Sequence, residues 1–245
     1  MLALLPPARR ALSSSPPIVE LRECRLRLSG AVAYLAAAAA SAPLRERLAP
    51  ARLFSLPETG GLLSVATHFY AYGSYLERDA SRAKQEGNPE WEAYLSAARP
   101  RVEERRSAIF VEAAGLRDAH GLHGMARADS PGGGEPAGIY ELRRYRLELG
   151  YDAVPLFLER LGGGLPSKLS SLAPGSALCS VMHSDVGDLN EVIELWRHAG
   201  PAGMLASREA ARGAGPWRDA IASIAPLANS FSTTVHRPAA FSKWK

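Results

Sequence analysis

The stretch HFYAY at residues 68–72 combines a histidine with aromatic side chains inside an apolar run of β-strand composition. Imidazole changes charge near neutral pH and also binds metal ions, so a strand histidine facing a cavity could act as a general base or a ligand. His68, Tyr70 and Tyr72 are therefore the candidate ligand-binding residues. The alternative, which the residue types favour, is a packed histidine whose ring nitrogens are hydrogen-bonded.

The other motifs that could carry chemistry are incomplete. GGGLPSKLS at 162–170 has a serine where a phosphate-binding loop requires glycine before the lysine. HGLHG at 120–124 offers two histidines without a further ligand at a metal-type interval. No G-x-S-x-G nucleophile elbow occurs in the sequence. We therefore predict no catalytic residue, no metal site and no cofactor.

Two lines of the sequence are nearly the same: VELRECRLRL at 19–28 and YELRRYRLEL at 140–149 share six of their ten residues. Further segments agree in the same order: 64–72 with 191–199, and 88–100 with 214–226. This spacing indicates an internal duplication. The alignment places Leu195 opposite His68, so the second copy lacks the histidine.

Each copy has the order of a ferredoxin-like unit, β-α-β-β-α-β. The first copy is expected to have strands at 19–28, 53–56, 62–72 and 107–112, and its first helix at 31–48 is kinked or split by Pro43. The second copy is expected to have strands at 140–149, 177–183, 191–198 and 230–236. Its first helix, at 152–161, is expected to end at the glycines 162–164. The fold class is α+β: two tandem ferredoxin-like domains that pack their bare sheet faces together as a pseudo-dimeric α/β barrel. The first domain is expected at 17–123 and the second at 139–245, joined by a flexible Gly/Pro-rich linker at 124–138.

The opening strand of each copy repeats an acidic and a basic residue, Glu20 with Arg22 and Glu141 with Arg143. The apolar residues of both strands change phase midway, which indicates a β-bulge or a change of layer. If the first apolar residues face the helices, the charged side chains point into the seam between the sheets, where unpaired charges are costly. We therefore predict inter-repeat ion pairs, Glu20 with Arg143 and Glu141 with Arg22.

Composition and charge are those of an ordinary globular chain. The 245 residues carry a formal net charge of +4, with basic residues scattered among acidic ones. A nucleic-acid partner is therefore not expected. No run of residues is long and apolar enough to predict a transmembrane helix. Cys24 and Cys179 have no partner at metal-type spacing and are expected to be reduced, buried thiols.

The leader at residues 1–16 contains Arg9, Arg10 and a serine cluster but no acidic side chain, which is the composition of a mitochondrial presequence. Pro6 and Pro7 disfavour the amphipathic helix that import receptors bind. The alternative is a disordered leader on a cytosolic protein. We predict a mitochondrial location, in the matrix or associated with the surface, with the cytosol as the alternative.

Several of these segments resemble the signature segments of the NIPSNAP family: YELRRYRLELG at 140–150, HFYAYGSYLER at 68–78, NPEWEAYL at 88–95 and GDLNEVIELW at 187–196. The resemblance spans both copies, from about residue 18 to the final FSKWK. It implies a pair of dimeric α/β-barrel-type domains in one chain, commonly associated with mitochondria. It implies roles in mitochondrial quality control, through autophagy adaptors, or in vesicle traffic, and it supplies no active-site residues. Cys24 stands where the family pattern usually has an aromatic residue.

The leading functional prediction is therefore a non-enzymatic adaptor or scaffold of NIPSNAP type whose partners are autophagy adaptors or other mitochondrial proteins. Association into a further oligomer stays open, because two fused copies already supply a pseudo-dimer. The alternative is a small-molecule or haem-binding barrel that resembles monooxygenases. In that case His68 would act as the ligand or base.

Overall fold

The computed structural model describes residues 16–245, so the predicted leader lies almost entirely outside it. The first repeat comprises β1 (Ile18–Leu26), α1 (Ala31–Ala40), α2 (Ala42–Leu48), β2 (Ala51–Thr59), β3 (Val65–Tyr72), α3 (Tyr75–Gln85), α4 (Pro89–Ala98), β4 (Val102–Glu112) and α5 (Ala114–His120). The second comprises β5 (Ile139–Leu147), α6 (Ala153–Ser170), β6 (Ala177–Val186), β7 (Glu191–His198), α7 (Pro201–Gly213), α8 (Gly215–Ile224) and β8 (Ala228–Pro238). Both repeats therefore have the ferredoxin-like order, followed in the first by an additional helix.

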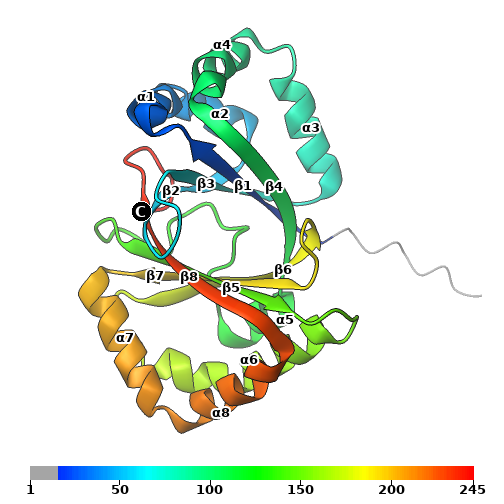
Figure 1. Cartoon of the computed structure of the whole chain (residues 1–245), viewed down its shortest axis with the longest axis vertical. Helices are drawn as coiled ribbons and strands as arrows, with labels where there is room; N and C mark the ends of the chain where they lie inside the picture. The colour runs from blue at the N-terminus through cyan, green and yellow to red at the C-terminus, as the bar shows by residue number, and fades with distance from the viewer. Residues whose placement is uncertain (1–15) are drawn as a thin grey trace, which may run out of the picture.

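The eight strands form one closed antiparallel barrel in the order β1-β3-β2-β8-β5-β7-β6-β4. Each repeat contributes four neighbouring strands, and the two sheets join where β2 pairs with β8 and β4 pairs with β6. Helices α1 to α4 cover one side of the barrel, and α6 to α8 cover the opposite side together with α5 of the first repeat (Figure 1). Closure leaves no sheet edge exposed. Within residues 16–245, no helix combines the length and apolar character needed to cross a membrane.

The barrel interior is a hydrophobic core shared by the two repeats. It contains Val19 and Leu21 from β1 and Tyr140 and Leu142 from β5, packed with Trp244 from the end of the chain. Glu20 and Arg22, on the alternate face of β1, point outward beneath the helices of their own repeat, where Arg78 and Arg82 of α3 meet Glu20. The predicted orientation of the opening strands was therefore reversed.

The apolar residues of these strands change layer midway, which confirms one of the two predicted alternatives: Val19 and Leu21 lie in the barrel core, whereas Cys24 and Leu26 pack beneath the helices. The β1–β3 register runs without interruption from Ile18 to Arg25, and the β5–β7 register from Ile139 to Arg146. The change of layer therefore occurs without a bulge, because the charged residues Glu20 and Arg22 occupy the helix-facing positions that precede Cys24 and Leu26. The bulges lie later, at the last residue of each strand, and affect only pairing with β4 and β8.

The first helix of the second repeat is longer than expected. The three glycines do not end α6, which continues to Ser170. A Cβ atom on Gly164 would lie 2.5 Å from Cβ of Ala220, so glycine allows α6 and α8 to pack closely. In the first repeat the expected interruption is confirmed, since Ser41 separates α1 from α2 and Pro43 lies in the first turn of α2.

The segments that follow β4 and β8 cross to the other repeat. Leu116 of α5 packs into the helical core of the second repeat, while Phe241, after β8, contacts Phe54 of the first at a ring distance of 4.7 Å. The 124–138 segment, expected to be flexible, is anchored at its start: Met125 is fully buried in the barrel core and accepts a 2.9 Å hydrogen bond from Arg52. The two halves therefore interlock.

Candidate functional site

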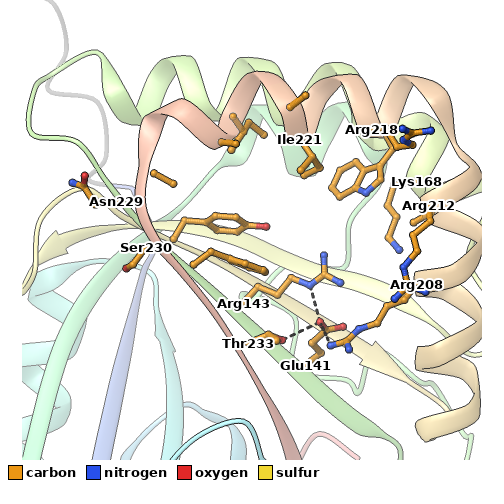
Figure 2. Close-up of a pocket in the computed structure, with 18 residues that line it drawn as sticks. Glu141, Arg143, Lys168, Arg208, Arg212, Arg218, Ile221, Asn229, Ser230 and Thr233 are labelled. Carbon is orange, nitrogen blue, oxygen red and sulfur yellow. Dashed lines mark hydrogen bonds and ion pairs between the residues drawn. The ribbon is translucent and has the colours of Figure 1, made fainter.

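A cavity of about 900 Å³ lies in the second repeat, between helices α7 and α8 and the outer face of β5 and β8. Figure 2 shows its polar end, where side chains from the sheet meet side chains from the helices. The polar and charged lining residues are Glu141, Arg143, Lys168, Arg208, Arg212, Arg218, Asn229, Ser230 and Thr233. The remaining lining is mainly apolar and aromatic, and includes Trp217, Ile221 and Phe231. The cavity therefore has one cationic end and apolar walls.

Glu141 organises the cationic end. Its carboxylate accepts hydrogen bonds from Arg208 at 2.7 Å, Arg143 at 2.8 Å and Thr233 at 3.0 Å, and lies 3.2 Å from Nε2 of His198. Burial alone would raise the pKa of Glu141, but the hydrogen bond from His198 and the neighbouring guanidinium groups outweigh burial and hold that pKa well below its usual range. Glu141 is thus ionised and fixes Arg143 and Arg208 in place (Figure 2).

A second buried carboxylate, Glu194, lies on β7 beside this network. Its Oε2 accepts a 2.7 Å hydrogen bond from the indole nitrogen of Trp196 and lies 3.7 Å from Arg143. Its Oε1 is buried without a hydrogen-bond partner. Burial, followed by the charge of Glu194, raises the pKa of Tyr145 well above its ordinary value, so Tyr145 is a neutral phenol at the cavity wall. The cavity therefore contains donors rather than a phenolate base.

Lys168 reaches the cavity from α6 and is 2% exposed. Its ammonium group donates a 2.9 Å hydrogen bond to the backbone oxygen of Ser207 and lies 5.3 Å from the centroid of the Trp196 ring. Burial and the nearby charge of Arg143 lower the pKa of Lys168 to about 8. A lysine of this kind is partly neutral near physiological pH.

Arg212 and Arg218 lie on the exposed side of the cavity, from α7 and α8. Neither has a carboxylate within 4.0 Å in the part of the chain that the structure describes, and both project from the helices in Figure 2. Unpaired guanidinium groups at a cavity mouth attract anions and can bind carboxylates or phosphates in a bidentate manner.

The predicted ligand-binding residues lie in the first repeat, on the outer, helix-covered face of β3. His68 stacks on Phe54, and its Nδ1 lies 3.0 Å from Arg45 and 3.2 Å from the Tyr70 hydroxyl. His68 Nε2 lies 3.3 Å from the hydroxyl of Tyr34. Burial and the charge of Arg45 lower the pKa of His68 well below its ordinary value. His68 is therefore a neutral, fully engaged imidazole.

Only part of the predicted trio lines a cavity. His68 and Tyr70 border a space of about 290 Å³, together with Arg45 and Trp91. Tyr72 lies outside it and packs with residues near the start of β1. The buried cation Arg45 and its tyrosine partners occupy this side of the molecule, which leaves a smaller cavity than that in the second repeat.

The predicted ion pairs between the repeats are wrong. Glu20 binds Arg22 at 2.9 Å, Arg78 at 2.9 Å and Arg82 at 2.8 Å, all in its own repeat. Glu141 likewise binds only residues of the second repeat, among them Arg143. The physical reason is that these side chains lie on opposite outer faces of the barrel, with the shared apolar core between them. Each carboxylate instead joins its sheet to its own helices.

The strand registers also correct the alignment of the repeats by one residue. Arg22 lies opposite His68, and the equivalent Arg143 lies opposite Glu194. His68 therefore corresponds to Glu194 rather than to Leu195. Neither Glu194 nor Lys168 was predicted from the sequence. The correct register would have shown Glu194, because it places a titratable residue at this strand position in each repeat. Lys168 lies on α6, and no register applies to it.

The sequence model of the NIPSNAP family matches residues 19–115 and 140–243, one match for each repeat. The chain belongs to the NIPSNAP family. A NIPSNAP family protein of unknown function from Agrobacterium tumefaciens is 25% identical over 43% of this chain and 92% of that one, with a TM-score of 0.39. No match was found among the curated proteins.

Two solved structures resemble this NIPSNAP chain over nearly its whole length. A candidate monooxygenase from Fusobacterium nucleatum covers 92% of this chain and 93% of its own, with a TM-score of 0.63 and 10% identity. Another from Lactobacillus acidophilus covers 91% and 94%, with a TM-score of 0.60 and 9% identity. At such low identity, the likeness establishes the barrel fold and does not extend to activity.

The residues of this NIPSNAP chain do not fit the haem of the alternative prediction. Both nitrogens of His68 face hydrogen-bonding partners, Arg45 and Tyr34, and the ring is 4% exposed. The cavity of the second repeat is lined by neither histidine nor cysteine nor methionine. Other lining residues of haem-ligating type include Cys24 in the first cavity and Tyr145 in the second, and both are held in their neutral forms because burial raises the pKa of each.

Proposed function

We propose that this NIPSNAP protein binds an anionic small molecule with an apolar body in the cavity of the second repeat. The observation that carries the proposal is the imbalance of charge in the lining, where five cationic side chains face one carboxylate: Arg143, Lys168, Arg208, Arg212 and Arg218 against Glu141. A ligand carboxylate, sulfonate or phosphate would complete the pairing of these cations.

The size and walls of the cavity support the same class of ligand. A volume of about 900 Å³ lies within the range of about 300–1,000 Å³ that is usual for small-molecule sites. Trp217, Ile221 and Phe231 provide apolar and aromatic contact area away from the charged end. An aromatic or aliphatic body would therefore be desolvated by the walls while its anionic group binds the arginines.

The test is a titration with 1-anilinonaphthalene-8-sulfonate, a fluorescent anion with an apolar body. We expect one saturable site on the native protein and a Kd about tenfold higher in Arg212→Gln, because a charge-assisted contact at the mouth is lost at a cost of about 1.4 kcal/mol. Arg27→Gln is the matched control, since Arg27 is exposed, belongs to the first repeat and is not among the lining residues. A titration in which both variants bind like the native protein would contradict the proposal.

The adaptor role and the mitochondrial location stay proposals that rest on family membership and on the composition of the leader. We expect that deletion of residues 1–16 from a tagged protein removes it from mitochondria, because the remaining chain lacks the basic presequence. Fluorescence microscopy with a mitochondrial marker provides the measurement. An unchanged location after the deletion would contradict the presequence hypothesis.

A further inference from the structure

Resting on the proposed function, we infer that Lys168 forms a Schiff base with the carbonyl group of its ligand, an anionic aldehyde or ketone bound in the cavity of the second repeat.

Lys168 differs in its surroundings from the other lysines of the chain. The sequence contains only four lysines, and Lys84 and Lys243 are exposed while Lys245 is half-buried. Lys168 is 2% exposed and lines the cavity. In Figure 2 its amine projects from the helix side toward the space above Arg143. Lys168 is therefore the one buried lysine that lines the cavity.

The charged groups around Lys168 disfavour its protonated form on balance. Arg143 from β5 and Arg208 from α7 lower its pKa, whereas Glu141 and Glu194 raise it. Burial is the largest effect, and neither carboxylate lies within 4.0 Å of the amine. Desolvation beside other cations is how proteins convert a lysine into a nucleophile.

The chemistry needs no further reactant. The neutral amine of Lys168 attacks the carbonyl carbon, and one of its two protons passes to the carbonyl oxygen, giving a carbinolamine. The hydroxyl group then leaves as water with the second proton of the amine, which leaves a C=N bond between Nζ and the ligand. No electron is transferred, and hydrolysis returns the aldehyde and the free amine. The arginines at the cavity mouth bind the ligand anion and so hold the carbonyl near the amine.

The experiment uses 4-formylbenzoate, which has an aldehyde and a carboxylate on one aromatic ring, with sodium cyanoborohydride to reduce any imine. Intact mass spectrometry and peptide mapping of the full chain are expected to show one adduct, on Lys168. The rate of labelling is expected to rise with pH through about 8, the pKa of this amine. Lys168→Arg keeps the positive charge without the nucleophile and is expected to show at least about tenfold less adduct.

Two further probes separate failure of the inference from failure of the proposed function. 4-Methylbenzaldehyde lacks the anion and is expected to label Lys168 about tenfold less than 4-formylbenzoate does. 4-Methylbenzoate lacks the aldehyde and should still bind to native protein and to Lys168→Arg, as measured by calorimetry. If 4-methylbenzoate binds but labelling is equal in Lys168→Arg, or falls on Lys84 and Lys243, the Schiff base is refuted alone. If 4-methylbenzoate does not bind either, the proposed function also fails.

Discussion

Replacement of Glu141 by alanine is expected to lower the free energy of unfolding by about 3–5 kcal/mol, the cost of breaking a buried ion network from one side. Glu141 is 1% exposed and is the shared partner of Arg143, Arg208 and His198. Without the carboxylate, Arg143 keeps only the more distant Glu194, at 3.7 Å. Urea unfolding followed by far-ultraviolet circular dichroism measures the change.

Glu209 provides the control, since it is exposed on α7 one residue beyond Arg208. Glu209→Ala is expected to change stability by less than about 0.5 kcal/mol. The effect of Glu141→Ala should also weaken at low pH. The folded pKa of Glu141 lies below its unfolded value near 4.5, so its stabilisation is complete above that value and is lost as pH falls through the folded pKa. Equal destabilisation by both variants at pH 7 would contradict this role.

Replacement of Trp244 by alanine is expected to cost about 3–5 kcal/mol, the range for removing a large buried aromatic side chain. Trp244 is fully buried in the barrel core, where its ring lies 5.2 Å from His123 and 6.4 Å from Tyr140. Its backbone nitrogen also donates a 2.9 Å hydrogen bond to the backbone oxygen of Arg52. The variant therefore opens a cavity in the core that both repeats share.

Differential scanning calorimetry measures this change, and the same scan shows whether the two repeats unfold together. Lys243→Ala is the control because Lys243 is exposed, and it should leave the melting temperature nearly unchanged. A single, lowered transition in Trp244→Ala is the expected result. Two separate transitions would show that the tail stabilises only one repeat.

The order of the strands could be predicted from the sequence because local signals determine it. Alternating apolar runs, turn glycines and the repeated opening line mark the elements of each copy, and the prediction for β7 matches its observed bounds of Glu191 to His198. Local signals could not predict which side chains of β1 face the barrel interior and which face the helices. Burial of Glu20 depends on Arg78 and Arg82, which approach from α3 and lie about sixty residues later in the chain.

The cavity of the second repeat was missed for a related reason. Its residues converge from β5, α6, α7, α8 and β8, and no two of its cationic side chains form a recognisable motif. The run GGGLPSKLS does not match a phosphate-binding loop, yet it contains the buried Lys168. Its Gly164 also allows α6 to pack closely against α8. A short motif could not show either role, because both depend on residues distant in sequence.

Because the two units are fused in one chain, the residues that line their cavities can change independently. In a symmetric dimer of identical chains, every substitution would appear in both cavities at once. Here the strand position that holds His68 in one half holds Glu194 in the other, and the buried cation that lines the cavity is Arg45 in one half and Lys168 in the other. The cavity around His68 can thus stay small while substitutions reshape the larger cavity of the other half.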